Sequence, residues 1–238
     1  MPAPLAQRRP FISVFYSWGL VATLFACRGT PSPIPPVPPD PRQQEIASLL
    51  NSYEDPEAWP AARTRLLNMG PDAESSLALG ILNRFASDRL QDWVRAEKEL
   101  LFFGTRAIPY LLAYLEFGDR IIQDRCSASL AHLGEPAIAA MTRALAATSS
   151  PAFRKALAQT LSRMPESPSA CWQLDQLLSD PDWTVRAYAC QGLGAAQPAT
   201  RWAPGLVRLL ADLDPYVQRQ AALALGNLRY RPARPALE

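Results

Sequence analysis

The sequence has little of the side-chain chemistry that catalytic sites commonly use. Its 238 residues include one histidine, four cysteines and only two lysines, Lys98 and Lys155. The lone histidine, His132, has no second histidine with which to share a metal, so we expect a partly buried packing residue. We find no Ser-His-Asp set, no glycine-rich phosphate loop and no paired carboxylates in a recognisable frame. These absences favour a protein that is not an enzyme and that uses no cofactor or metal.

An excess of charge of one sign is also missing from most of the chain. There are 24 basic and 22 acidic residues, and the difference of two corresponds to Arg8 and Arg9 near the N-terminus. A body without net charge offers no electrostatic footprint for nucleic acid, which argues against a nucleic-acid partner. Hydrophobic residues make up 48% of the sequence, enough to build a folded core.

The N-terminal residues predict an export signal. Residues 1–10 carry two arginines and no acid, and residues 11–26 form an apolar run. As a helix this run is about 24 Å long, shorter than the roughly 30 Å hydrocarbon core of a bilayer. A basic start and a short apolar run are typical of a signal peptide. The run ends in LFAC, with Cys27 last, which resembles the lipobox of bacterial lipoproteins with Phe25 in place of the usual second residue.

The lipobox resemblance implies that Cys27 is acylated and becomes the N-terminus after cleavage. Each methylene of an acyl chain that enters the membrane adds about 0.8 kcal/mol to the binding free energy, so two or three chains would hold the protein on a membrane almost permanently. We therefore expect a membrane-anchored lipoprotein of the bacterial cell envelope that faces the periplasm or the extracellular side. An uncleaved anchor helix and a simple signal peptide stay open as alternatives. Arg8 and Arg9 also resemble a twin-arginine export signal, which leaves the export route open.

A proline-rich stretch follows the cysteine. Seven of the 24 prolines lie within residues 31–41. Because proline fixes φ and lacks an N–H donor, we expect residues 28–41 to be an extended polyproline II linker of roughly 40 Å. A ligand for another domain is the alternative to a spacer. The sequence thus predicts three regions: an export signal (1–27), a linker (28–41) and a repeat domain (42–238).

From residue 43 onward the sequence repeats a helical pattern and lacks strand signals. DPDWTVRAYACQGLG, which begins at Asp180, returns as DLDPYVQRQAALALG from Asp212. Each unit has an apolar helix, a short turn with glycine or proline at a marker position, and a second amphipathic helix. The marker positions, 29 to 34 residues apart, are Gly70, Gly104, Gly134, Pro165, Gly194 and Gly226.

Each part of this pattern has a physical reason. A glycine at the marker position can adopt the left-handed conformation that ends the first helix. Aspartate at the start caps the helix, and proline suits its first turn. A lone helix pair cannot bury its apolar face, so neighbouring pairs must stack. Pro165 in place of glycine, with a longer turn after it, leaves the geometry of the fourth unit open.

The pattern resembles the short bacterial HEAT-like repeats first noted in phycobilisome lyases. The resemblance implies an all-α fold, a right-handed α-α superhelix that is a solenoid of stacked helical hairpins. Residues 43–53 are expected to form an extra helix at the N-terminal end. Residues 231–238 would begin the second helix of the last repeat, either as a sufficient cap, as an edge that meets a partner, or as a truncation.

The candidate functional surface is the concave face that second helices line in such a superhelix. When the repeats are aligned, one position of the second helices is occupied by Leu79, Ala113, Arg143, Gln176 and Arg208. A neighbouring position is occupied by Ser76, Tyr110, Ala140, Gln173 and Gly205. Tyrosine, tryptophan and arginine commonly anchor protein interfaces. The predicted protein-binding residues are Tyr110, Tyr114, Arg143, Gln173, Gln176, Trp202 and Arg208.

We therefore expect a membrane-anchored, non-catalytic scaffold or assembly factor whose partner is a protein or peptide. A lyase-like enzyme, or an enzyme-assisting subunit acting on a partner's prosthetic group, is the alternative; it rests on repeat similarity alone. A cytosolic adaptor is a third. The three cysteines of the body, Cys126, Cys171 and Cys190, are expected to be small buried core residues, with a Cys171–Cys190 bridge as the alternative.

Overall fold

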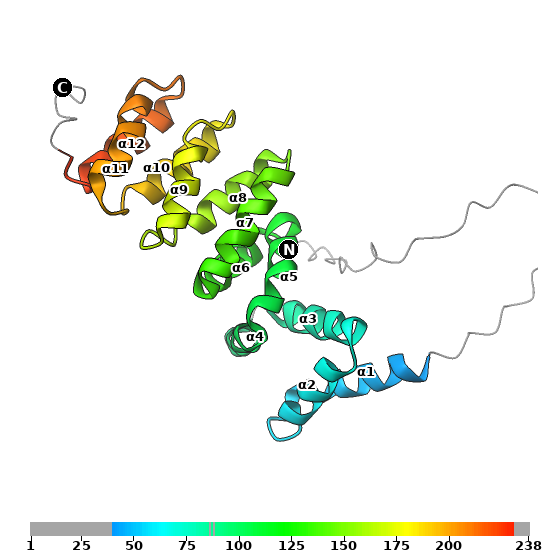
Figure 1. Ribbon diagram of the computed structural model, residues 1–238. Helices are drawn as coiled ribbons and strands as arrows, with labels where there is room; N and C mark the ends of the chain where they lie inside the picture. Colours follow the sequence, from blue (N-terminus) through cyan, green and yellow to red (C-terminus); the bar gives the residue numbers. More distant parts are fainter. Residues whose placement is uncertain (1–39, 86, 88, 231–238) are drawn as a thin grey trace, which may run out of the picture. The chain divides into compact units, whose positions relative to one another are not determined.

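The computed structural model of the protein describes residues 40–85, 87 and 89–230 (Figure 1). The chain divides into a unit of residues 1–40 and a compact unit of residues 41–238. The predicted export signal, Cys27, most of the proline-rich linker and the C-terminal stub at 231–238 lie outside the described residues.

The described part of the chain is all-α, without strands, as predicted. It begins with α1 (Pro41–Asn51), which covers the predicted extra helix, followed by the short 3-10 turn η1 (Ser52–Glu54). Helix pairs then follow in order: α2 (Trp59–Asn68) with α3 (Pro71–Phe85), α4 (Leu90–Phe103) with α5 (Ile108–Phe117), α6 (Arg120–Leu133) with α7 (Glu135–Ala147), α8 (Pro151–Leu161) with α9 (Pro168–Leu177), and α10 (Trp183–Leu193) with α11 (Ala199–Arg208). Two further 3-10 turns, η2 (Gly104–Ala107) and η3 (Leu209–Ala211), precede α5 and the last helix, α12 (Pro215–Asn227).

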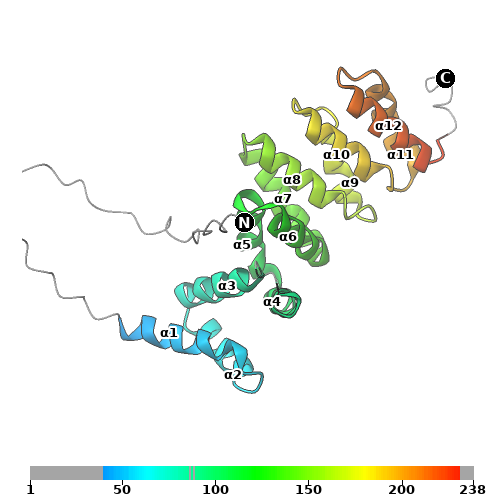
Figure 2. The same cartoon turned by 180° about the vertical axis from the view of Figure 1, so that it is seen from behind.

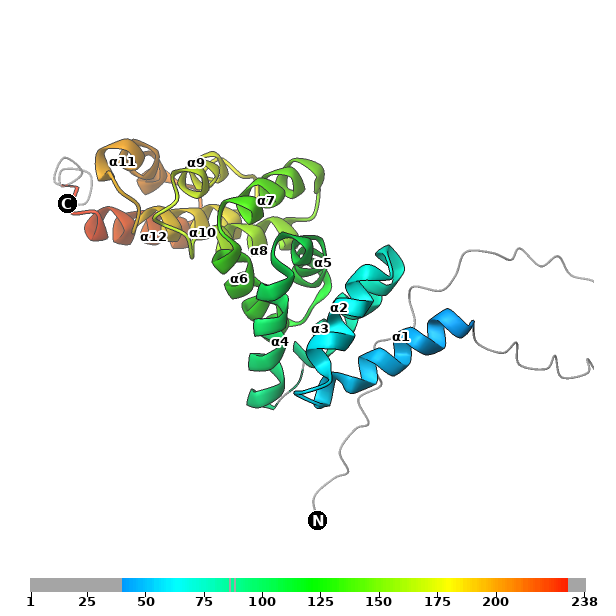
Figure 3. The same cartoon turned by 60° about the horizontal axis from the view of Figure 1, so that its bottom comes forward.

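The helix pairs stack on their neighbours in sequence. We call α2, α4, α6, α8, α10 and α12 the first helices, and α3, α5, α7, α9 and α11 the second helices. From α4 to α12 each first helix packs against the next one, and α5, α7 and α9 do the same (Figure 2). In Figure 3, α7, α9 and α11 form one row and α8, α10 and α12 a second. Within the described ranges, extensive contacts join only elements close in sequence, as expected for stacked repeats.

One continuous hydrophobic core runs through the stack. It is built mostly from leucine and alanine side chains that face the neighbouring pair, such as Leu77, Leu111 and Leu157, which are fully buried. Residues 90–117 are long and apolar enough to span a membrane by length and hydropathy alone. In the structure this stretch is α4, η2 and α5, broken at Gly104, and its apolar residues contribute to the core.

Three of the marker glycines have the predicted left-handed backbone. The φ angles of Gly70, Gly104 and Gly134 are 101°, 60° and 68°, and each residue ends the first helix of its pair. The fourth pair keeps the repeat geometry although Pro165 replaces glycine, because α8 and α9 are joined by a longer turn and Ser167 caps α9. The pattern of a helix, a marker and a second helix is therefore confirmed.

The prediction of a left-handed glycine is wrong at the last two markers. Gly194 has a right-handed φ of −63°. A Cβ atom built there would lie 2.9 Å from the Cα of Ala224, so glycine at this position allows α10 and α12 to approach closely. Gly226 lies inside α12, which continues to Asn227, and Arg229 takes the positive φ of 52° instead.

Candidate functional site

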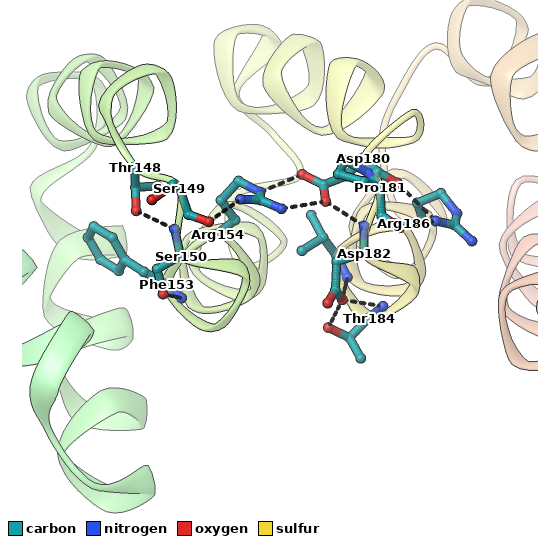
Figure 4. A network of polar contacts seen from close by, with 11 residues as sticks. Thr148, Ser149, Ser150, Phe153, Arg154, Asp180, Pro181, Asp182, Thr184 and Arg186 are labelled. Carbon is teal, nitrogen blue, oxygen red and sulfur yellow. Dashed lines mark hydrogen bonds and ion pairs between the residues drawn. The ribbon is translucent and has the colours of Figure 1, made fainter.

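Two arginines of the first helices, Arg154 and Arg186, join neighbouring repeats. Arg154 on α8 donates from Nε and Nη2 to the Asp180 carboxylate at 2.8 and 3.1 Å (Figure 4). Arg186 on α10 repeats the arrangement with Asp212, with both N···O distances at 2.8 Å. The four side chains are between 5% and 15% exposed. These bidentate pairs satisfy buried charges within the fold, so their guanidinium groups are not available to a ligand.

The same aspartates shape the starts of α10 and α12. Asp180 also accepts the backbone N–H of Asp182, which in turn caps α10 by accepting the N–H of Thr184 at 2.8 Å (Figure 4). Hydrogen bonds from Thr184 lower the pKa of Asp182, and the hydrogen bonds from Arg186 lower the pKa of Asp212. The repeated DxD letters are therefore a structural device, which confirms the predicted cap.

The arginines of α7 and α11 are different. Arg143, Arg201 and Arg208 are exposed, and none of them forms an ion pair with any residue of the described ranges. The guanidinium of Arg201 lies 4.8 Å from the centroid of the Trp202 ring. A guanidinium has five donors in a planar fork that matches a carboxylate, so these three groups can bind an acidic ligand.

A hollow of about 430 Å³ lies across α7, α9 and α11, on the row of second helices. The indole of Trp172 is 49% exposed in its wall. Glu135 is held at its edge by the hydroxyl of Ser167, which donates to Oε1 at 2.6 Å. The hollow thus combines an exposed aromatic face with polar groups, and its lining includes Glu135, Ile138, Thr142, Trp172, Gln173 and Arg201. We call this hollow, together with Arg143 and Arg208, the second-helix surface.

Four of the predicted binding residues lie on exposed or partly exposed parts of this surface. Gln173 lines the hollow and is half-buried. Arg143, Gln176 and Arg208 are exposed on α7, α9 and α11. Gly205, which occupies an equivalent position on α11, is buried. A Cβ atom there would lie 2.6 Å from Cδ1 of Leu178, so the backbone at Gly205 packs closely against this side chain.

The two predicted tyrosines connect α5 to α3. The hydroxyl of Tyr110 lies 3.0 Å from Oγ of Ser75, and that of Tyr114 donates to Oδ1 of Asn83 at 3.4 Å. Both rings are half-buried against the core, and burial raises the pKa of Tyr114. The structure therefore gives these residues a role in joining repeats and does not bring them into the hollow across α7, α9 and α11.

The interpretation of Trp202 as a surface anchor is wrong. Its side chain is 3% exposed and belongs to the core, together with Ala203 and Leu206 of the same helix. Sequence reasoning missed Trp172, whose indole takes the exposed position. The signal was present, because the buried residues of α9 follow helical spacing and leave Trp172 outside the stripe: Ala170, Cys171, Leu174 and Leu177.

The cysteines and the histidine of the body differ in their surroundings. The three cysteines are free and buried, which confirms their expected core role, and no Cys171–Cys190 bridge is formed. Burial raises the pKa of Cys126 and of Cys190 to about 12, so their nucleophilic thiolate forms are suppressed at neutral pH. His132 is 64% exposed, with Nδ1 at 3.8 Å from Oε1 of Glu97, so the expected packing role is wrong. Among the residues that the structure describes, no cluster of three metal-ligating side chains is found.

The comparison with protein families agrees with this geometry. Residues 172–238 match the family model for HEAT repeats. The last repeats of the array are therefore similar to HEAT repeats. The same pairing of first and second helices extends back to α2. No curated protein sequence matches the chain.

Several solved structures are similar to part or most of the chain. The complex of CpcE and CpcF of phycocyanin lyase from Nostoc sp. PCC7120 is 22% identical and covers 63% of this chain and 98% of its own, with a TM-score of 0.42. Human deoxyhypusine hydroxylase in complex with glycerol is 20% identical and covers 79% of this chain and 75% of its own, also at 0.42. A designed armadillo repeat protein is 16% identical and covers 78% of this chain and 98% of its own, with a TM-score of 0.36. At these values the similarities carry no inference about activity or partners.

Proposed function

We propose that the HEAT-like array is a non-catalytic scaffold whose second-helix surface binds an acidic segment of a partner protein. The observation that carries this proposal is the contrast between two sets of arginines. Arg154 and Arg186 are buried in bidentate pairs, whereas Arg143, Arg201 and Arg208 are exposed without an ion-pair partner in the described ranges.

The hollow beside these arginines supplies the second element of an interface. Exposed tryptophan and arginine side chains are the residue types that contribute most to protein binding. An acidic side chain of the partner would accept a bidentate bond from a guanidinium, while an apolar side chain would cover the indole of Trp172. The buried thiols offer no nucleophile for an alternative catalytic role.

The experiment is crosslinking and capture of partners from native membranes, followed by identification of the captured proteins. The variants R143A/R208A and W172A should each lose most of the captured partner, and raised salt should weaken capture by the wild type. The matched control is R163A, which removes an arginine that is 40% exposed but already paired with Asp124. Equal capture by R143A/R208A, W172A and the control would refute this surface as the binding site.

We also propose that the array is held on a bacterial membrane through an acylated Cys27, with the proline-rich residues as a spacer. The support is the sequence LFAC after a short apolar run and a basic start. Metabolic labelling with a fatty-acid analogue should modify the wild-type protein and not C27A. Equal labelling of the two proteins would exclude lipid attachment at this residue.

A further inference from the structure

A second hollow, of about 220 Å³, lies across α8, α10 and α12, on the row of first helices. Its apolar wall consists of the rings of Trp183, Tyr188 and Tyr216. Trp183 and Tyr216 are each 44% exposed, and their rings meet edge to face with 5.7 Å between centroids. Aromatic faces grouped in a surface hollow are typical of a site that binds an apolar, flat-sided ligand.

Most polar groups at the rim of this hollow have no partner among the described residues; the exception is Thr184, whose hydroxyl donates to Asp182. Lys155, Gln191 and Gln220 line the hollow, together with the indole N–H of Trp183 and the hydroxyls of Tyr188 and Tyr216. None of these side-chain groups has a hydrogen bond to another described residue. Each of these groups can donate a hydrogen bond, and the ammonium of Lys155 and the indole N–H of Trp183 can only donate, so the hollow can serve a ligand that is rich in acceptors.

A proline-rich strand in the polyproline II conformation has this chemistry. It has no internal hydrogen bonds, its carbonyl oxygens are free, and each proline removes an N–H donor. Aromatic-lined grooves are the usual sites for such segments, because the ring of proline packs flat on an aromatic face and little entropy is lost. The ligand class is therefore a proline-rich peptide.

The chain itself contains a segment with the required period. A polyproline II helix has three residues per turn, so residues three apart lie on the same edge. One edge of the segment carries Pro33, Pro36 and Pro39, and a second carries Pro35 and Pro38. We propose that the aromatic hollow of α8, α10 and α12 binds the proline-rich residues 31–39 of a second copy of this chain.

The assignment to a second copy follows from the reach of the segment. Its middle proline, Pro36, is five residues from Pro41, the first residue of α1, which is about 16 Å at 3.1 Å per residue. Packed helices lie 8–10 Å apart, so the succession α4, α6, α8 and α10 alone spans roughly 24–30 Å. The layer formed by α1, α2 and α3 lies before α4 in the stack. With Pro36 in the hollow, the five residues up to α1 of the same molecule are too few to bridge this span.

The first experiment measures peptide binding by fluorescence anisotropy. The probe is a labelled synthetic peptide of residues 28–41, RGTPSPIPPVPPDP, and the protein is residues 41–238, a compact unit with its own core that lacks residues 31–39. We expect saturable binding that is at least tenfold weaker for W183A/Y216A. The control F117A removes an aromatic side chain that is 81% exposed at the end of α5, and should bind within twofold of the wild type.

Two further arms separate the parts of the proposal. A peptide in which Pro33, Pro36 and Pro39 are alanine should bind at least tenfold more weakly than the wild-type peptide. In the full chain, a photo-crosslinking amino acid in place of Val37 should attach to α10 or α12 of a differently tagged copy. Circular dichroism of W183A/Y216A checks that the variant is folded.

The outcomes that overturn the proposal are distinct. Absence of saturable binding, or equal binding by W183A/Y216A, removes the aromatic hollow as a proline site. Crosslinks within one copy only remove the assignment to a second molecule. The residues involved lie on first helices, so these results are independent of the tests of Arg143, Arg208 and Trp172.

Discussion

The pair between Arg186 and Asp212 offers a quantitative test of how neighbouring repeats are held together. Its side chains are 15% and 6% exposed, and two N···O contacts of 2.8 Å join them. A second pair, Arg163 with Asp124, also joins adjacent repeats but has one contact of 3.0 Å and side chains that are 40% and 47% exposed. The two pairs share their chemistry and differ in burial and in geometry.

Burial sets the expected size of each interaction. Two charges 4 Å apart attract by about 4 kcal/mol at an effective dielectric constant of 20 and by about 1 kcal/mol in water. Loss of hydration offsets part of the attraction in the buried pair. We expect a coupling free energy of about 1.5–3 kcal/mol between Arg186 and Asp212, and of at most about 0.5 kcal/mol between Arg163 and Asp124.

Substitution of Arg186 alone should cost more than this coupling. The variant R186M keeps an apolar stem of similar length but leaves the Asp212 carboxylate largely buried without its cation. Breaking a buried pair on one side typically costs 3–5 kcal/mol, and the partial exposure of Arg186 reduces our expectation to about 2–4 kcal/mol. The corresponding variant R163M should cost less than about 1 kcal/mol.

The assay is urea denaturation of residues 41–238, followed by circular dichroism. A double-mutant cycle of R186M and D212N gives the coupling free energy of the buried pair, and R163M with D124N gives that of the exposed pair. Unchanged m-values would show that the transition stays equally cooperative in all variants. A coupling below about 0.5 kcal/mol for Arg186 and Asp212, or equal couplings in the two cycles, would refute the role of burial.

Further predictions concern acid, packing and thiols. Arg186 lowers the pKa of Asp212, so the ionised carboxylate stabilises the folded protein fully above the unfolded-state pKa of about 3.9. This stabilisation is lost as pH falls through the lower folded-state pKa. The difference in unfolding free energy between wild type and D212N should therefore shrink from pH 5 to pH 3. G194A should destabilise the protein by about 1–3 kcal/mol through overpacking, and A224G should restore part of this loss in the double variant. The three cysteines of the body should react with a thiol reagent only after denaturation, as mass spectrometry would show; rapid labelling of the native protein would contradict their burial.

The helix pairs could be predicted from the sequence because their signals are local. An aspartate that caps a helix, a proline in the first turn and a glycine after the last turn act within a few residues, whatever the rest of the fold does. Gly194 could not be interpreted in the same way, since its reason lies in α12, where Ala224 approaches it from the next repeat. Glycine thus allows a turn with positive φ at Gly104 and a close contact between helices at Gly194.

The surface was harder to predict than the fold because it depends on helix rotation. An error of one residue in register turns a side chain by about 100° around the helix axis. This is why Trp202 was placed on the surface although it lies in the core, while the indole of Trp172 was overlooked. Hydrogen bonds such as that of Tyr110 with Ser75 join residues from different repeats, and no local pattern in the sequence reports them.

The pairing of charges explains how a body without net charge can still present a site for charged ligands. Where Asp180 and Asp212 occur, the preceding first helix supplies Arg154 and Arg186, and these charges neutralise each other between repeats. On α7, α9 and α11, three exposed arginines face only two acids, Glu135 and Asp175, and form no ion pairs with described residues; Arg120 on α6 and Arg219 on α12 are also exposed without such a pair. Net charge therefore reports the sum over the whole fold, whereas a ligand meets only the charges that the fold leaves unpaired. The place to look for partners is where the fold leaves charges unpaired, as at Arg201 in the hollow that also contains Trp172.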